Sequence, residues 1–132
     1  MPQASLSALV AALQSSWSRH EFELLLATFR DAELGVVDLN QPKGTRHAAP
    51  AGEIQLGTVQ GEDEQPRIVA FDQPERWMAK LGHGCNLSMR GAEIFQRLLS
   101  QPDCAGIVLY SSEDEPLSIT LERADIELFL RS

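Results

Sequence analysis

The stretch RIVAFDQPERWMAKLGHGCNLSMRGAEIFQRLL, from Arg67 to Leu99, decides the fold. Its first segment, RIVAF, is short, apolar and contains two β-branched residues, which predicts a strand over 67–71. Asp72 follows as a good N-cap residue, and Glu75 stands at the spacing of a capping box. We therefore expect a helix over 72–81, directly after the strand.

The second half of this stretch predicts an extended segment and another helix. Residues 83–88 (HGCNLS) follow the helix-ending Gly82 and are expected to form a short strand or an extended link. Ser88 is the expected N-cap of the next helix. The apolar residues of that helix recur at helical spacing and are Ile94, Phe95, Leu98 and Leu99. Strands that alternate with helices in this way indicate an α/β architecture.

Working outward toward the N-terminus, the sequence predicts two further strands. Residues 54–59 alternate apolar with polar or small side chains, and the polar turn at 61–66 separates them from RIVAF, so 54–71 predicts a hairpin. The segment ELGVVD, at 33–38, has adjacent valines that suit a strand better than a helix. Residues 40–52 (NQPKGTRHAAPAG) contain turn-forming residues and no apolar period, and we expect a mobile loop there.

Two helices are expected before these strands. An N-terminal helix within 1–17 has one apolar stripe, made of Leu6, Leu9, Val10 and Leu13. A second helix is expected to begin at Ser18, because Glu21 follows at the spacing of a capping box. Its buried face is expected to hold Phe22, Leu25, Leu26 and Phe29. Trp17 precedes the cap and is expected to pack against Phe22 or its neighbours as a hydrophobic staple.

The C-terminal part predicts two strands and a last helix. Residues 105–110 (AGIVLY) form the most apolar of the predicted strands, and we expect this strand in the interior of its sheet. A short strand is expected over 117–120, after an acidic turn. The last helix carries Ile126, Phe129 and Leu130.

Length and composition indicate one domain over residues 1–132. A chain of 132 residues with 43% hydrophobic residues can bury one core and has no room for two. We therefore expect a single compact α/β (α+β) domain, in which helices pack against a mixed β-sheet.

The charge limits the classes of partner. With 11 basic against 19 acidic residues, the net charge is −8, which argues against a broad surface for nucleic acid or anionic membranes. No apolar run reaches the roughly 18 residues that would predict a membrane span. The first basic residue is Arg19, so the N-terminal segment lacks the basic start of a signal peptide. We therefore expect a cytoplasmic protein.

Four segments of the chain resemble a bacterial family, the N-terminal domain of the enhanced-serine-sensitivity protein SseB. They are EFELLLATFRDAELGVV (21–37), RIVAFDQPERWMAK (67–80), GAEIFQRLL (91–99) and EPLSITLERADIELFL (115–130). The resemblance covers about residues 20–130 and lies in motifs of fold and packing. It implies a small cytoplasmic α/β domain without an assigned activity. Members of the family often carry a second, C-terminal domain.

One pair of residues suggests thiol chemistry. His83 and Cys85 are two residues apart, so on an extended segment their side chains share a face, and a nearby histidine can support a thiolate. No third group that would orient the histidine is identifiable. The alternative is that Cys85 packs in the core and His83 lies in a turn. We expect Cys85 and Cys104 to be buried free thiols, because two cysteines are too few for a disulfide framework.

No metal or cofactor is expected. The histidines and cysteines, at 20, 47, 83, 85 and 104, have none of the spacings of known metal sites. The glycines of GHGCNLSMRG do not follow the order of a phosphate-binding loop. The acidic runs at 62–64 and 113–115 lie in predicted turns, where solvated charge is the simpler interpretation.

The sequence therefore favours a non-catalytic protein-interaction or regulatory module of the bacterial cytoplasm. The candidate binding residues are Arg76, Trp77, His83, Cys85 and Arg90, which surround the predicted 72–81 helix and the link after it. The expected partner is a protein, and self-association is one version of this function. The alternative is a small-molecule sensor or a thiol-dependent enzyme that uses the His83–Cys85 region.

Overall fold

A mixed six-stranded sheet forms the centre of the computed structural model, which describes residues 6–39, 55–61, 63–72, 87–110 and 118–131. The strands are β1 (Glu33–Val36), β2 (Thr58–Gln60), β3 (Pro66–Asp72), β4 (Leu87–Arg90), β5 (Gly106–Tyr110) and β6 (Ser118–Glu122). Their order is β4-β1-β3-β5-β6, and β2 pairs with β3 beside this path. Of the strand pairs within the described residues, only β3 and β5 are parallel, as in the pairs Arg67–Gly106 and Phe71–Tyr110.

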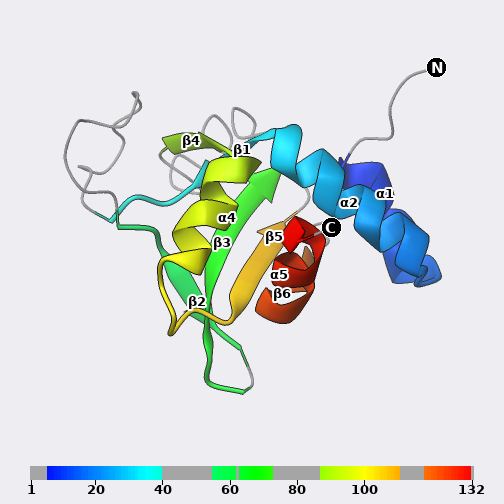
Figure 1. The fold of residues 1–132 in the computed structure, drawn as a ribbon. Coiled ribbons are helices and arrows are strands. Elements are labelled where there is room, and N and C mark those ends of the chain that lie inside the picture. Colours follow the sequence, from blue (N-terminus) through cyan, green and yellow to red (C-terminus); the bar gives the residue numbers. More distant parts are fainter. Residues whose placement is uncertain (1–5, 40–54, 62, 73–86, 111–117, 132) are drawn as a thin grey trace.

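Helices cover one face of this sheet (Figure 1). They are α1 (Leu6–Ser15), α2 (Arg19–Asp31), α4 (Gly91–Leu99) and α5 (Arg123–Arg131). The helix α2 contacts both α4 and α5, and α1 packs beside α2 and reaches β6. The described residues therefore form one α+β domain, which confirms the predicted fold class.

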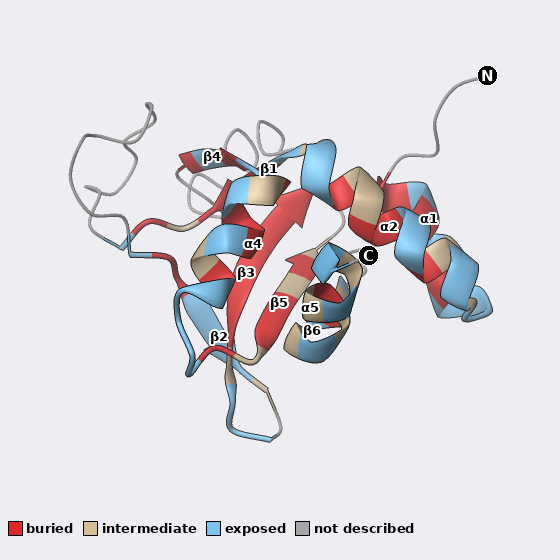
Figure 2. Cartoon of the chain, viewed as in Figure 1, coloured by how far each residue is buried: buried red, intermediate tan, exposed pale blue. Residues whose placement is uncertain are grey.

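The core lies between the sheet and these helices, and Figure 2 shows the buried residues on the inner sides of the helices and along β3. The rings of Phe29 on α2 and Phe95 on α4 stack with their centroids 5.1 Å apart. The apolar positions predicted for the first two helices are all buried: Leu6, Leu9, Val10, Leu13, Phe22, Leu25, Leu26 and Phe29. Helical periodicity alone therefore identified the buried face of both helices.

The start of α2 confirms the predicted cap. Ser18 is the N-cap, and its side-chain oxygen accepts a hydrogen bond from the backbone N–H of Glu21 at 3.3 Å. The Trp17 ring packs against Phe22 with the centroids 5.8 Å apart, as the staple predicted. This contact sets the direction in which the chain enters α2.

The strand predictions agree with the sheet. The hairpin over 54–71 is present as the antiparallel pair β2 and β3, and the apolar strand at 105–110 is present as β5, an interior strand between β3 and β6. The predicted strand at 33–38 is present as β1, and an isolated bridge between Asp38 and Leu56 continues its pairing.

The predicted cap at Ser88 is wrong. Ser88 lies inside β4 and pairs with Gly35 of β1, because pairing with β1 holds the chain in an extended conformation as far as Arg90. The helix α4 starts at Gly91, and the N-cap residue Arg90 makes no side-chain hydrogen bond to it. The Gly91 N–H instead donates to the carbonyl of Ala32 at 2.9 Å. A backbone contact thus replaces the expected serine cap.

Three predictions fall outside the described residues: the helix over 72–81 beyond its first residue, the link at 83–86 and the loop at 40–52. Asp72, the expected cap of that helix, is the last residue of β3 and is buried, and the Ser7 hydroxyl of α1 donates to its carboxylate at 2.7 Å. None of the described helices has the length and the apolar character needed to cross a membrane.

Candidate functional site

Among the predicted site residues, only Arg90 lies in the described part of the chain. Arg76, Trp77, His83 and Cys85 lie outside it, so their proximity to one another stays a prediction. Arg90 is exposed at the start of α4.

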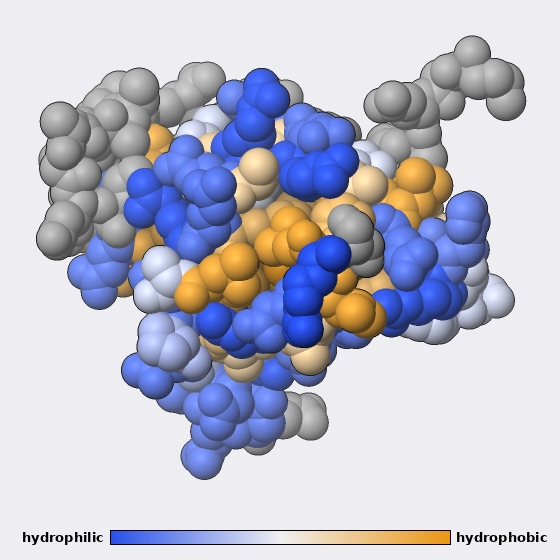
Figure 3. Space-filling view, in the orientation of Figure 1, coloured by the Kyte–Doolittle hydropathy of each residue, from blue (hydrophilic) through white to orange (hydrophobic). Residues whose placement is uncertain are grey.

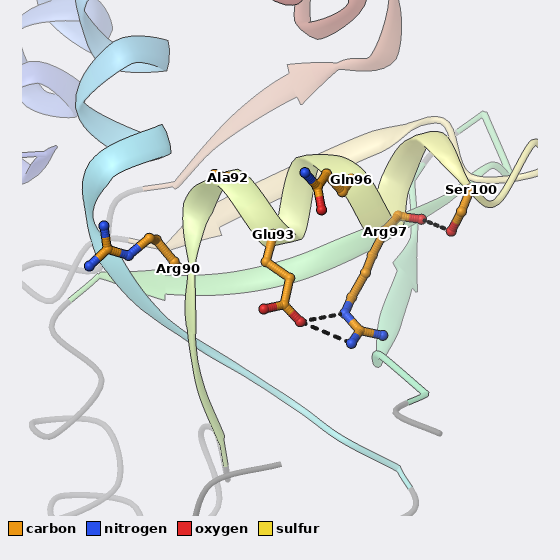
Figure 4. A pocket seen from close by; sticks show the side chains of 6 residues that line it. All are labelled: Arg90, Ala92, Glu93, Gln96, Arg97 and Ser100. Carbon is orange, nitrogen blue, oxygen red and sulfur yellow. Dashed lines mark hydrogen bonds and ion pairs between the residues drawn. The ribbon is translucent and has the colours of Figure 1, made fainter. Parts of the chain in front are cut away.

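Arg90 lines a shallow polar depression of about 410 Å³ on the outer side of α4 (Figure 4). Its other lining residues are Ala92, Glu93, Gln96, Arg97 and Ser100. The Arg97 guanidinium donates twice to the Glu93 carboxylate, at 3.1 and 2.9 Å, whereas the Arg90 side chain points away from both. Within the described residues Arg90 makes no ion pair, so it can meet an acidic group of a partner.

A second hollow, of about 220 Å³, lies where α1, α2, β6 and α5 meet. Its lining residues are Leu13, Gln14, Trp17, Phe22, Ile119, Thr120 and Asp125, and we call it the Trp17 groove. Among these described residues the apolar ones are Leu13, Trp17, Phe22 and Ile119, and the ionisable one is Asp125. A mixture of apolar and polar groups is typical of recognition sites.

Trp17 is the most exposed large apolar residue among those that the structure describes, with 60% of its surface accessible. Packing against Phe22 fixes one side of its ring. Arg19 then ties this corner to α5, because its guanidinium lies 3.6 Å from the Asp125 carboxylate and 3.3 Å from that of Glu23. The indole is therefore held in a defined position and open to solvent.

Other exposed apolar side chains do not form a comparable site. Figure 3 shows apolar side chains at the centre of this face, in the region of α4 and α5, with hydrophilic side chains around and across them. Leu99 on α4 and Leu128 and Leu130 on α5 are exposed, but none of them lines either of the two hollows described above.

Two buried or half-buried arginines hold the fold together. Arg67 on β3 binds Asp63 and Glu122, and these carboxylates raise the pKa of its guanidinium above the usual range. Arg123 at the start of α5 binds backbone carbonyls at the end of α4. Because both are already paired within the chain, neither is available to a ligand.

Cys104 is a buried free thiol, as predicted, and its sulfur lies 3.4 Å from the carbonyl oxygen of Gly106. Over the described ranges, no group of three or more His, Cys, Asp or Glu side chains is placed to hold a metal ion. The groups with evident binding geometry are therefore Arg90 and the Trp17 groove.

The sequence pattern predicts Trp17 only as a packing residue. A hydrophobic staple uses one side of the Trp17 indole. The local sequence pattern does not indicate whether a distant element covers the other side. The hollow depends on Ile119 and Asp125, which lie about a hundred residues further along the chain. The signal that was available is the residue type, since tryptophan is the residue most enriched at binding hot spots.

Comparison with models of protein families, with curated proteins and with solved structures finds no match for this chain.

Proposed function

We propose that this protein is a protein-interaction module and that the Trp17 groove is its binding site. The observation that carries the proposal is the 60% exposure of a tryptophan that lines a hollow of mixed apolar and polar side chains. Binding hot spots are rich in tryptophan, and they lie in pockets that a partner closes off from water. The proposal keeps the function that the sequence favours, but it places the binding site at the start of α2 rather than in the 72–90 region.

The arrangement of the groove supports this function. The Trp17 ring packs on Phe22 and is held before any partner arrives, so this chain loses less conformational entropy on binding. Leu13 and Ile119 add apolar side chains to the lining, which also includes the Asp125 carboxylate, 3.6 Å from the Arg19 guanidinium. A partner can therefore bury an apolar side chain here and still find a polar contact.

The proposal includes membership of the SseB N-terminal family, which rests on the four resembling segments, and the place in the bacterial cytoplasm that this resemblance implies. The alternative, a sensor or thiol-dependent enzyme at His83 and Cys85, rests on residues outside the described part of the chain and stays a prediction.

Affinity purification tests the proposed function. The tagged chain, its Trp17→Ala variant and its Val59→Ala variant are purified from native cells, and the bound proteins are quantified by mass spectrometry. Val59 is exposed and apolar but lies on β2, at the far end of the sheet from α1, so it serves as the control (Figure 1). We expect one partner near stoichiometry with the wild type and Val59→Ala, and its loss with Trp17→Ala. Equal recovery with all three chains would contradict the assignment of the groove.

A further inference from the structure

The outer edge of β6 forms one wall of the Trp17 groove. The direction of its backbone groups follows from its neighbours. The Arg123 N–H donates to the carbonyl of Ala105 at 2.8 Å, which points position 123 toward β5. Since backbone groups alternate sides along a strand, positions 119 and 121 also point toward β5, and positions 118, 120 and 122 point outward.

A side chain confirms this direction. The carbonyl of Ser118 accepts a hydrogen bond from the Gln14 side-chain amide of α1. Thr120 is exposed, lines the groove and lies two residues further along the same edge. Among the described strands β6 is terminal, so the Thr120 N–H and C=O have no strand on their outer side. An edge of this kind can pair with a strand from another chain.

We infer that the Trp17 groove binds an extended peptide segment of another protein, which adds to β6 as a strand at Thr120. The inference rests on the proposed function and specifies its partner. The segment exchanges backbone hydrogen bonds with Thr120 and places a bulky apolar side chain against Trp17 and Ile119. Because Gln14 already occupies the Ser118 carbonyl, the added strand runs along the Thr120 to Glu122 side of the edge.

Charge determines the chemistry of this segment. The chain carries a net charge of −8. Among the described residues at the groove, the Arg19 guanidinium lies between the Asp125 and Glu23 carboxylates, which leaves one negative charge in excess there. A lysine or arginine next to the apolar residue would therefore meet complementary charge. A second copy of this chain would bring another −8 to the same place, so the observations favour a basic peptide over self-association.

The size of the groove agrees with this occupant. A hollow of about 220 Å³ accepts one large side chain, whereas a partner helix needs a longer groove for several anchors along its face. Strand addition supplies the rest of the affinity through backbone hydrogen bonds, and the side-chain pocket supplies the selectivity.

A phage-displayed library of random peptides, selected against the full chain, tests the inference. We expect enriched peptides to carry a large apolar residue within two positions of a lysine or arginine. A synthesised winner should slow hydrogen exchange of the Thr120 amide by at least about tenfold, as measured by NMR. Trp17→Ala should weaken its binding by about thirtyfold, in line with a hot-spot residue, and Val59→Ala should leave binding unchanged.

Thr120→Pro separates strand addition from side-chain binding. Proline is tolerated where a strand N–H faces away from the sheet, so this variant should keep its fold by circular dichroism and lose the peptide. Ile119→Pro, whose N–H faces β5, should unfold the chain and provides the control for direction.

Several outcomes would overturn the inference. The inference would be contradicted if the selected peptides are acidic, if they lack a large apolar residue, or if no peptide is enriched over a control selection without the protein. Loss of the cellular partner with Trp17→Ala but not with Thr120→Pro would leave the proposed function standing and reject strand addition. Sedimentation that shows a dimer, lost with Thr120→Pro, would assign the edge to a second copy of this chain.

Discussion

The Arg67 guanidinium on β3 reaches across β5 to the Glu122 carboxylate on β6. Arg67 pairs in register with Gly106 of β5, and Gly106 pairs with Glu122, so the three residues form one row across the sheet. The guanidinium spans this row, and its Nε lies 3.0 Å from Oε1 of Glu122. The same guanidinium binds both oxygens of Asp63, in the turn between β2 and β3. One side chain therefore connects the hairpin to the edge strand of the Trp17 groove.

Arg67→Met should destabilise the domain. The Arg67 side chain is 9% accessible and makes charge-assisted hydrogen bonds to two carboxylates, and both carboxylates are half exposed and can be solvated after the change. We expect the free energy of unfolding to fall by about 1–2 kcal/mol in urea titrations. Arg19→Met is the matched control, because Arg19 is 45% accessible in its two ion pairs and should cost no more than about 1 kcal/mol. Equal losses for the two variants would contradict the connecting function of Arg67.

The Asp63 carboxylate should make stability depend on acid pH. Hydrogen bonds from the Arg67 guanidinium, and then from the Gln65 N–H, lower the pKa of Asp63 from 3.8 to about 2. A carboxylate whose pKa is lower in the folded than in the unfolded chain stabilises the fold when the pH is above its unfolded-state pKa. This stabilisation is lost as the pH falls from about 4 to about 2. Asp63→Asn should therefore be less stable than the wild type at about pH 5, and the difference should close toward about pH 2. A constant difference between their urea midpoints over this range would contradict the assignment.

The sequence predicted the parts of the fold that depend on local pattern. Helical spacing identified the buried faces of α1 and α2, and a serine three residues before Glu21 identified the cap of α2. These predictions are confirmed because an N-cap and an apolar helix face each depend on residues only one or two helical turns apart in the sequence.

The contacts between distant residues could not be predicted in this way. Arg67 and Glu122 lie 55 positions apart, and their pairing requires the strand order β3-β5-β6. The Ser88 prediction failed for the related reason that pairing with β1 keeps position 88 in a strand. Local pattern does not predict the Trp17 groove, because Ile119, which lines it, lies about a hundred residues further along the chain.

Gly91→Ala should destabilise the domain although alanine favours helices. A Cβ at position 91 would lie 1.8 Å from the carbonyl oxygen of Phe29, which belongs to the backbone of α2 and cannot rotate away as a side chain could. We expect a loss of about 2–3 kcal/mol, because α4 must shift away from α2. Ala92→Gly, at the next position, should cost only about 1 kcal/mol through helix propensity. A Gly91→Ala chain as stable as the wild type in urea would show that α2 and α4 can separate freely.

Arg123 should stabilise the end of α4 through geometry as well as charge. Its Nη1 donates to three backbone carbonyls at 2.9–3.0 Å, which belong to Leu98, Gln101 and Cys104. These groups include a carbonyl of the last helical turn, which lacks a partner within the helix.

Arg123→Lys keeps the positive charge at this helix end but loses the planar fork, so it separates the two effects. We expect Arg123→Lys to lower the free energy of unfolding by about 1–2 kcal/mol and Arg123→Met by about 2–3 kcal/mol. Arg97→Met is the control, because its ion pair with Glu93 is a half-exposed helical pair worth only about 0.3–0.5 kcal/mol. If Arg123→Lys is as stable as the wild type, the positive charge alone stabilises the C-terminal end of α4. The hydrogen bonds to the three carbonyls would then add nothing to the free energy of unfolding.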